Sequence, residues 1–249
     1  MVKSFTIYGE RCSGTNYLED IINKNFDISI TWKYGWKHFF GFSDLENSDD
    51  TLFICIVRNP VDWMNSLYKV PYHLSYNNTC SLDNFLTIPI VSYTKNILPY
   101  ISSKEFKING INNGTIMKED TNIFNVNKYY DNIFELRHCK NKYLIDILPK
   151  KVKNYILVRH EDLLSDFENT MHQIELAGNL KKKHINFINS VNYKNNPNFV
   201  FKKENKYHII SSIMIVNNTN YNHFYEQKLG YSSYNKINKS FGKQLRKIT

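Results

Sequence analysis

One continuous apolar run limits the possible folds more than any other part of the sequence. Residues 52–57 read Leu-Phe-Ile-Cys-Ile-Val, without the polar alternation of a half-exposed strand. Strands of this kind are typical of parallel sheets that are covered on both faces. Two further short strand patterns, at residues 5–8 and 155–158, are each followed by a helical pattern. Strands that alternate with helices predict an α/β fold, with an open, mostly parallel sheet flanked by helices.

Local patterns predict the positions of the other elements. We expect an extended segment over about residues 28–40 and a helix that has Pro60 in its first turn. Residues 133–136 are interpreted as a strand, and the residues that follow, up to about 148, as a helix. The helix that follows the last strand is expected to end at the Gly-Asn pair at residues 178–179, which can cap its C-terminus.

The length and composition fit one globular domain. The chain has 249 residues, of which 42% are hydrophobic and 22% are charged, close to the globular average. No internal repeat or linker marks a boundary, so residues 1–249 are expected to form a single domain. An Asn-, Ser- and Tyr-rich stretch over about residues 72–130 is interpreted as an insertion that shapes a substrate site.

The cysteines and the N-terminal residues predict the cellular location. The chain has four cysteines, and no two of them form a Cys-x-x-Cys pair, which argues against zinc-ribbon and thioredoxin-type motifs. Cys55 lies within the apolar run and is expected to be buried. The sequence begins without a signal-peptide hydrophobic region, and no apolar run reaches the ~20 residues of a membrane helix. We therefore expect a cytoplasmic protein.

The charge balance predicts an anionic partner. Lys and Arg number 32 and Asp and Glu number 23, which gives a net charge of +9. Such a surplus fits a nucleotide, a nucleic acid, an acidic glycan or a membrane surface. The longest basic run is the lysine triplet at residues 181–183. The absence of a denser tract disfavours a nucleic-acid partner and leaves a solvated basic surface as the alternative.

A glycine-bounded loop follows the first predicted strand. Gly9 and Gly14 have the spacing of a phosphate-binding loop between a strand and a helix. The residues after Gly14 are Thr15 and Asn16, so the lysine of an ATP- or GTP-hydrolysing loop is missing. The backbone N–H groups of the loop and the hydroxyl groups of Ser13 and Thr15 can still hold phosphate or sulfate. The alternative is an ordinary strand-to-helix turn.

A second polar pair follows the apolar run. Arg58 leaves the carboxyl end of the strand at residues 52–57, which is the edge where open α/β sheets bind ligands. Ser66 stands eight residues later, about two turns along the next helix. A guanidinium and a hydroxyl in these positions can hold one phosphate group. An arginine ion pair and a serine on the helix surface are the alternative interpretation.

Together the two features resemble the sulfotransferases that use 3′-phosphoadenosine-5′-phosphosulfate (PAPS) and release 3′-phosphoadenosine-5′-phosphate (PAP). The resemblance covers residues 3–70 and 153–178 and implies a P-loop-like sulfotransferase architecture. It implies that Ser13-Gly14-Thr15 cradles the 5′-phosphosulfate and that Arg58 and Ser66 hold the 3′-phosphate. The remaining cofactor-binding candidates come from the same loop: Arg11, Cys12 and Asn16. The resemblance implies transfer of a sulfuryl group to a hydroxyl or amine acceptor, with a carbohydrate as one candidate, and no metal.

The resemblance also implies the catalytic residues. Lys37 and His38 precede Arg58 at a distance similar to the Lys-x-His pair of many family members, so His38 is the expected base and Lys37 a stabiliser of the transferring group. A histidine suits proton removal because its pKa lies near neutrality. Three other side chains compete for the role of base, Glu10, Asp62 and His73, and of these Glu10 is favoured because it lies in the loop itself.

The loop departs from the family pattern at one position. The family has Lys or Arg directly before Ser-Gly-Thr, whereas this chain has Cys12 there, with Arg11 one residue earlier. Either Arg11 or Lys37 supplies the missing cation, or the site binds its ligand without fast turnover. Cys12 next to a helix N-terminus is also a candidate for a lowered thiol pKa, which would suit a nucleophile.

Three later elements complete the comparison with the family. Glu161-Asp162-Leu163 after a strand and Leu229-Gly230-Tyr231 resemble family segments. Lys202 and Lys203 are the nearest candidates for a segment that closes over the 3′-phosphate. Two other functions stay open: a nucleotide kinase-like P-loop protein, and a basic non-catalytic protein that binds polyanions or nucleotides.

Overall fold

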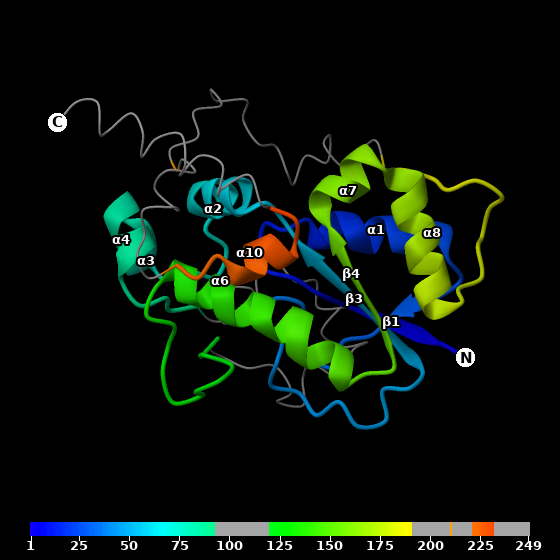
Figure 1. Cartoon of the computed structure of the whole chain (residues 1–249), viewed down its shortest axis with the longest axis horizontal. Coiled ribbons are helices and arrows are strands. Elements are labelled where there is room, and N and C mark those ends of the chain that lie inside the picture. Colours follow the sequence, from blue (N-terminus) through cyan, green and yellow to red (C-terminus); the bar gives the residue numbers. More distant parts are fainter. Residues whose placement is uncertain (93–119, 191–209, 211–220, 232–249) are drawn as a thin grey trace.

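A parallel sheet forms the centre of the molecule. The computed structural model describes residues 1–92, 120–190, 210 and 221–231. Within them four strands pair in parallel in the order β2-β1-β3-β4 (Figure 1). The strands are β1 (Ser4–Tyr8), β2 (Ser29–Ile30), β3 (Thr51–Val57) and β4 (Asn154–Arg159). The predicted α/β class with an open parallel sheet is therefore confirmed.

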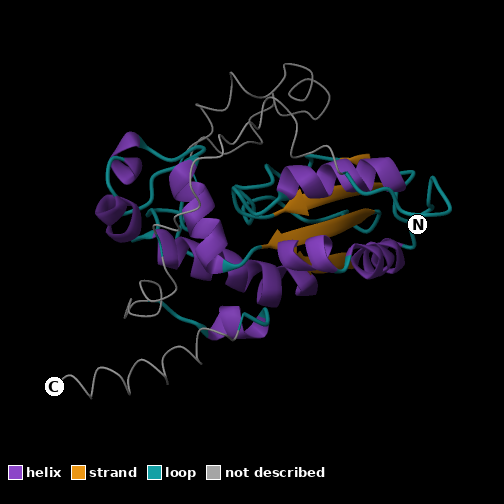
Figure 2. Cartoon of the chain, turned by 90° about the horizontal axis from the view of Figure 1, so that it is seen from above, coloured by secondary structure: helices purple, strands orange, loops and turns teal. Residues whose placement is uncertain are grey.

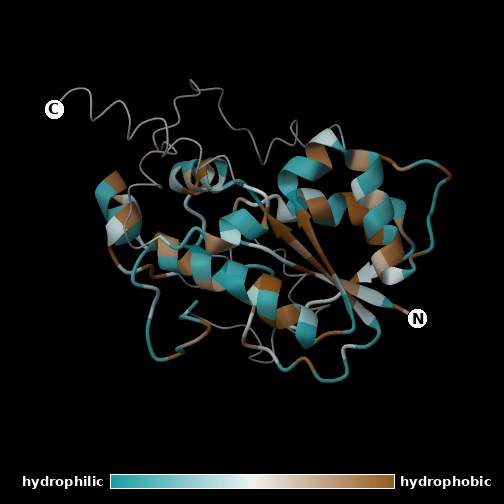
Figure 3. Ribbon diagram, viewed as in Figure 1, coloured by the Kyte–Doolittle hydropathy of each residue, from teal (hydrophilic) through white to brown (hydrophobic). Residues whose placement is uncertain are grey.

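Burial on both faces explains why the sequence of strand β3 lacks polar alternation. All seven of its residues are buried. Leu52, Ile54 and Ile56 belong to a hydrophobic core on one face of the sheet, and Phe53, Cys55 and Val57 belong to a second core on the other face. The central strands are accordingly hydrophobic along much of their length (Figure 3).

Helices lie on both sides of the strands (Figure 2). The first core contains buried residues of α1 (Thr15–Asn25), α7 (His160–Ser165) and α8 (Phe167–Gly178). The second contains residues of the π-helical turn η3 (Tyr143–Ile147), which continues α6 (Ile133–Lys142) and leads to η4 (Leu148–Lys150). The remaining helices are α2 (Pro60–Lys69), α3 (Tyr76–Thr79), α4 (Leu82–Thr87) and α10 (Phe224–Lys228).

The helix boundaries test three of the local predictions. Pro60 opens α2, as expected. Asn179 caps α8 in the left-handed conformation with φ 46°, so the predicted C-cap is confirmed. The helical stretch before it is divided into α7 and α8, which the sequence pattern did not separate.

Of two predicted extended segments, one is wrong and the other is much shorter than expected. Residues 133–136 begin helix α6, because the side chain of Asn132 accepts hydrogen bonds from the backbone N–H groups of Phe134 and Glu135. A four-residue apolar run cannot by itself distinguish a strand from a helix start. In the segment 28–40, only Ser29 and Ile30 pair with β1. The residues after them turn, and their aromatic rings are buried by stacking, as in the Trp32–Trp36 pair at 5.0 Å.

The cysteines, the helices and the predicted insertion can be compared with the sequence analysis. All four cysteines are free, and Cys55 is buried as predicted. None of the helices in the described ranges has the length and apolar character needed to cross a bilayer. Of the predicted insertion at 72–130, residues 93–119 lie outside the described part of the chain.

Candidate functional site

The loop between β1 and α1 passes close to two neighbouring strands at their carboxyl ends. A Cβ atom at Gly9 would lie 2.6 Å from Cγ2 of Ile56, so only glycine fits against β3. Gly14 has φ +94°, and a Cβ atom there would clash with the ring of His160, which follows β4. Helix α1 then begins without a side-chain cap and without an acidic residue in its first turn. Its first backbone N–H groups therefore form a positive end that suits an anion.

Arg58 reaches this loop at Cys12, and Ser66 lies near the thiol of the same residue. Nη1 of Arg58 donates a hydrogen bond to the backbone carbonyl oxygen of Cys12 at 3.0 Å. Burial raises the pKa of the Cys12 thiol to about 11, while a hydrogen bond with Ser66 and the charge of Arg58 act in the opposite direction. The expectation of a lowered thiol pKa is wrong, because burial outweighs the neighbouring donors. Cys12 stays protonated at neutral pH and is a poor nucleophile.

His160 is a residue of this site that the sequence analysis did not single out. It lies at the start of α7, directly after β4, and its ring packs against Gly14. Burial lowers the pKa of His160 to about 4, with the charge of Arg58 adding to the effect. The ring is therefore neutral at physiological pH. The sequence could have indicated His160 through its position directly after a predicted strand, because residues that follow parallel strands lie together at the carboxyl edge of the sheet.

Lys37 and His38 contact the residues that flank this loop, Asn16 of α1 and Gly9 after β1. Nζ of Lys37 donates hydrogen bonds to Oδ1 of Asn16 and, at 3.2 Å, to Oε2 of Glu19. Nδ1 of His38 lies 2.7 Å from the carbonyl oxygen of Gly9. Because a carbonyl oxygen only accepts, Nδ1 carries the proton and Nε2 keeps its lone pair. Burial lowers the pKa of His38 well below 6.5, with Lys37 as the next cause.

A second histidine stands beside His38. The ring centroids of His38 and His73 are 6.3 Å apart. Burial lowers the pKa of His73 to about 3, with the charges of Arg11 and Lys37 adding to the effect. Nδ1 of His73 is buried and finds no hydrogen-bond partner among the residues that the structure describes. Of the competing bases, His73 is thus adjacent to His38.

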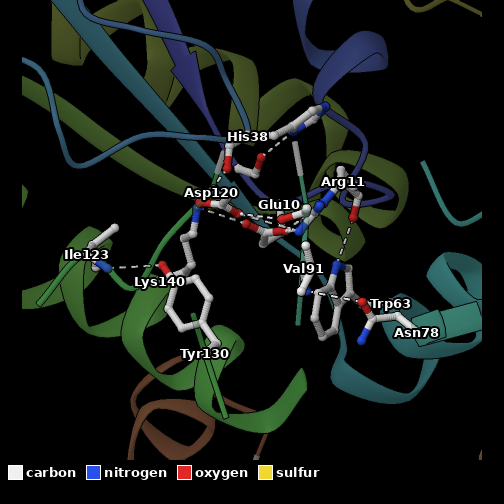
Figure 4. A network of polar contacts seen from close by, with 12 residues as sticks. Glu10, Arg11, His38, Trp63, Asn78, Val91, Asp120, Ile123, Tyr130 and Lys140 are labelled. Carbon is white, nitrogen blue, oxygen red and sulfur yellow. Dashed lines mark hydrogen bonds and ion pairs between the residues drawn. The ribbon is translucent and has the colours of Figure 1, made fainter. Parts of the chain in front are cut away.

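Arg11 and Glu10 are enclosed in a buried ionic cluster beneath the loop (Figure 4). The guanidinium of Arg11 lies 3.1 Å from the carboxylate of Glu10 and 3.7 Å from that of Asp120. Nζ of Lys140 lies 2.8 Å from Asp120 and 3.4 Å from Glu10. The Arg11 side chain has no exposed area, and the carbonyl oxygen of Arg11 accepts a hydrogen bond from the indole of Trp63 at 2.8 Å. Two cations and two carboxylates balance, so the cluster fixes the loop without excess charge.

The structure thus brings most of the predicted residues to one edge of the sheet. Arg58 contacts the loop at Cys12, Ser66 lies near the same residue, and Lys37 contacts Asn16 in the first turn of α1. Ser13 and Thr15 are buried on either side of Gly14. Asp120 and Lys140 were not predicted, because nothing in the sequence marks them as partners of the loop. Lys202 and Lys203 lie outside the described residues.

Comparison with known proteins adds no relative. No family model, curated protein or solved structure matches this chain. In the described ranges, no group of three or more His, Cys, Asp and Glu side chains is placed to hold a metal ion. A functional conclusion therefore depends on the chain's own residues and their geometry.

Acid should destabilise the fold through histidines whose pKa values are lowered by burial, chiefly the buried His38 and the partly buried His73 and His160. His38, His73 and His160 have lowered pKa values and stay neutral when folded, whereas the unfolded chain binds protons below about pH 6.5. Protons therefore favour the unfolded state. The free energy of unfolding should be intact above pH 6.5 and should fall toward pH 4 by up to ~1.4 kcal/mol per pH unit for each histidine. Urea unfolding at a series of pH values measures this slope.

A pair of matched variants tests how much His73 contributes to the pH dependence of the free energy of unfolding. His73→Gln should reduce the pH dependence, whereas His172→Gln, with 55% of that side chain exposed, is the control. A free energy of unfolding that is equally pH-dependent in both variants would show that His73 does not contribute to the acid sensitivity.

Proposed function

We propose that the protein is a PAPS-dependent sulfotransferase that acts on a hydroxyl or amine acceptor. The observation that carries the proposal is the hydrogen bond from Arg58 to the carbonyl of Cys12, with Ser66 near the thiol of the same residue, beside the uncapped N-terminus of α1. Two groups of anion-binding residues, from separate stretches of the chain, meet at the carboxyl edge of a parallel sheet. One ligand with two phosphorylated ends suits this arrangement.

The β1–α1 loop and the residues after β3 would bind different ends of the nucleotide. The backbone N–H groups at the start of α1, with the hydroxyls of Ser13 and Thr15, would hold the 5′-phosphosulfate. Arg58 and Ser66 would hold the 3′-phosphate. The Arg11 side chain has no exposed area and is enclosed with Glu10 and Asp120. Lys37 instead bonds Asn16 at the start of α1 and, among the described residues, pairs with only one carboxylate, that of Glu19. Lys37 is therefore the proposed cation for the transferring group.

The chemistry needs a base and fixed positive charge, and no covalent enzyme intermediate. The acceptor oxygen or nitrogen forms a bond to sulfur while the bond from sulfur to the oxygen of the 5′-phosphate breaks, and PAP leaves. Nε2 of His38 takes the acceptor proton, since Nδ1 is held protonated by the carbonyl of Gly9. The Lys37 ammonium and the N-terminal amides of α1 offset the negative charge that develops on the sulfuryl and bridging oxygens.

Ligand-dependent stability tests the proposal. PAP at 100 times its Kd should raise the free energy of unfolding by about 2.7 kcal/mol, because it binds only the folded state. Thermal unfolding measured with PAP, with adenosine 5′-phosphate and with Mg-ATP separates the candidate ligands, and an acceptor panel with PAPS then reports turnover as PAP release. Stabilisation by Mg-ATP alone would favour a kinase-like protein. Salt-sensitive stabilisation by any polyanion, unchanged by Arg58→Ala, would favour a non-catalytic basic protein.

A further inference from the structure

Residues 221–231, called the 221–231 segment below, pack against the ends of two strands that carry the candidate site. The segment contains α10, which lies beside α6 (Figure 1). Its side chains Tyr221, Tyr225, Glu226, Leu229 and Tyr231 are all buried. Two of them, Glu226 and Tyr231, are each connected through one other side chain to the same backbone position after β3.

That position is the peptide bond between Arg58 and Asn59, which is held from both sides. Its carbonyl oxygen, on Arg58, accepts a hydrogen bond from Nη2 of Arg137 at 2.8 Å. Its N–H group, on Asn59, donates to Oε1 of Glu161 at 2.8 Å. A peptide unit is planar, so fixing its C=O and N–H directions fixes its rotation relative to the strand. The direction in which the Arg58 side chain leaves the strand is thereby fixed as well.

The 221–231 segment holds both of these partners. Glu226 accepts from Nε of Arg137 at 2.7 Å and from Nη2 at 2.8 Å, a two-point contact that sets the plane of the guanidinium. Tyr221 donates a further hydrogen bond to Glu226. The hydroxyl of Tyr231 donates to Oε2 of Glu161 at 2.8 Å, which leaves Oε1 directed at Asn59. Each side of the peptide is thus linked to the same segment through one intermediate side chain.

We infer that the 221–231 segment orients Arg58 toward the β1–α1 loop, with Glu226 and Tyr231 as positioning residues. Its consequence for the 3′-phosphate rests on the proposed function. Arg58 is only partly buried, and within the described part of the chain its guanidinium donates a hydrogen bond to the carbonyl of Cys12. The fixed peptide bond between Arg58 and Asn59 therefore sets the direction in which this side chain leaves the strand toward Cys12.

The variant Tyr231→Phe tests the inference with little risk to folding, because it removes one hydroxyl from a side chain that stays packed. Its matched control is Tyr225→Phe, in the same segment, where the lost hydroxyl bonds Asp146 at 2.6 Å and has no link to Arg58. Backbone hydrogen exchange of the ligand-free proteins should be faster at Asn59 in Tyr231→Phe than in the control. This readout requires no nucleotide.

Nucleotide selectivity provides the second readout. Affinity for PAP should fall roughly tenfold in Tyr231→Phe, while affinity for adenosine 5′-phosphate, which lacks the 3′-phosphate, should stay near the wild-type value. A general loss of stability would instead lower the affinities for PAP and adenosine 5′-phosphate by the same factor. In an Arg58→Ala background the Tyr231→Phe change should have no further effect on the ratio of the two affinities.

Each outcome decides between the two proposals. Exchange at Asn59 that is the same in Tyr231→Phe and Tyr225→Phe would overturn the inference, whatever the protein binds. Faster exchange with an unchanged PAP selectivity, in a protein where Arg58→Ala does lower that selectivity, would also overturn it. Faster exchange in a protein whose wild type binds no PAP would support the coupling of the 221–231 segment to Arg58 and reject the sulfotransferase proposal.

Discussion

Replacing Arg58 by alanine should weaken PAP binding about 100-fold, because a charge-assisted two-point contact with a phosphate group is lost. The fold should survive, since the backbone around Arg58 is held by Arg137 and Glu161 rather than by the Arg58 guanidinium. Titration of the thermal shift with PAP gives the two dissociation constants.

The specificity of the Arg58 effect can be controlled within the next helix. Lys69→Ala removes the same unit of charge from the exposed end of α2 and should leave PAP affinity within a factor of about two at moderate salt. Ser66→Ala should weaken PAP as well, by less than Arg58→Ala, because it removes a neutral donor. Equal loss of affinity in Lys69→Ala and Arg58→Ala would mean that PAP senses only the net charge of the surface.

The second large effect is expected at His38. His38→Asn should bind PAP with near wild-type affinity and lower kcat about 100- to 10,000-fold, the usual contribution of a general base. Asparagine is chosen because its amide N–H can still donate to the carbonyl of Gly9, which accepts from Nδ1 of His38. The variant therefore removes the lone pair of Nε2 without leaving a buried carbonyl unpaired. Single-turnover PAP release measures the chemical step.

The pH profile provides an independent check on the same residue. A base must be neutral to accept a proton, and burial lowers the pKa of His38 well below 6.5. The acidic limb of kcat/KM should therefore lie well below pH 6.5, and the rate should be flat from there to neutral pH. If His38→Asn turns over at the wild-type rate, the neighbouring His73 becomes the candidate base; His73→Asn then distinguishes the two.

The parts of the fold that the sequence predicted are those in which burial leaves a local pattern. Strand β3 is buried on both faces, so its residues are apolar without interruption. The turn at Pro60 and the cap at Asn179 depend on the conformational preferences of single residues. The spacing of Arg58 and Ser66 follows from a strand that ends and a helix that begins, so it too is visible locally.

The remaining parts depend on partners that are distant in the sequence. Arg137 and Glu226 are 89 residues apart, and nothing near either residue indicates the other. The same holds for Asn59 and Glu161, which are 102 residues apart. Residues 28–40 mislead for a different reason: alternating aromatic residues have the period of a strand, although here their rings pack between turns. Long-range pairing, and not local preference, orients the candidate site.

The ionic cluster beneath the loop has a consequence for biosynthesis. The carboxylate of Asp120 and the ammonium of Lys140 complete the surroundings of Glu10 and Arg11, yet they are translated more than a hundred residues later. A nascent chain that has just left the ribosome can form the first strand and helix but cannot yet bury these two charges with all their partners. The loop therefore acquires its native shape late, when most of the polypeptide has emerged.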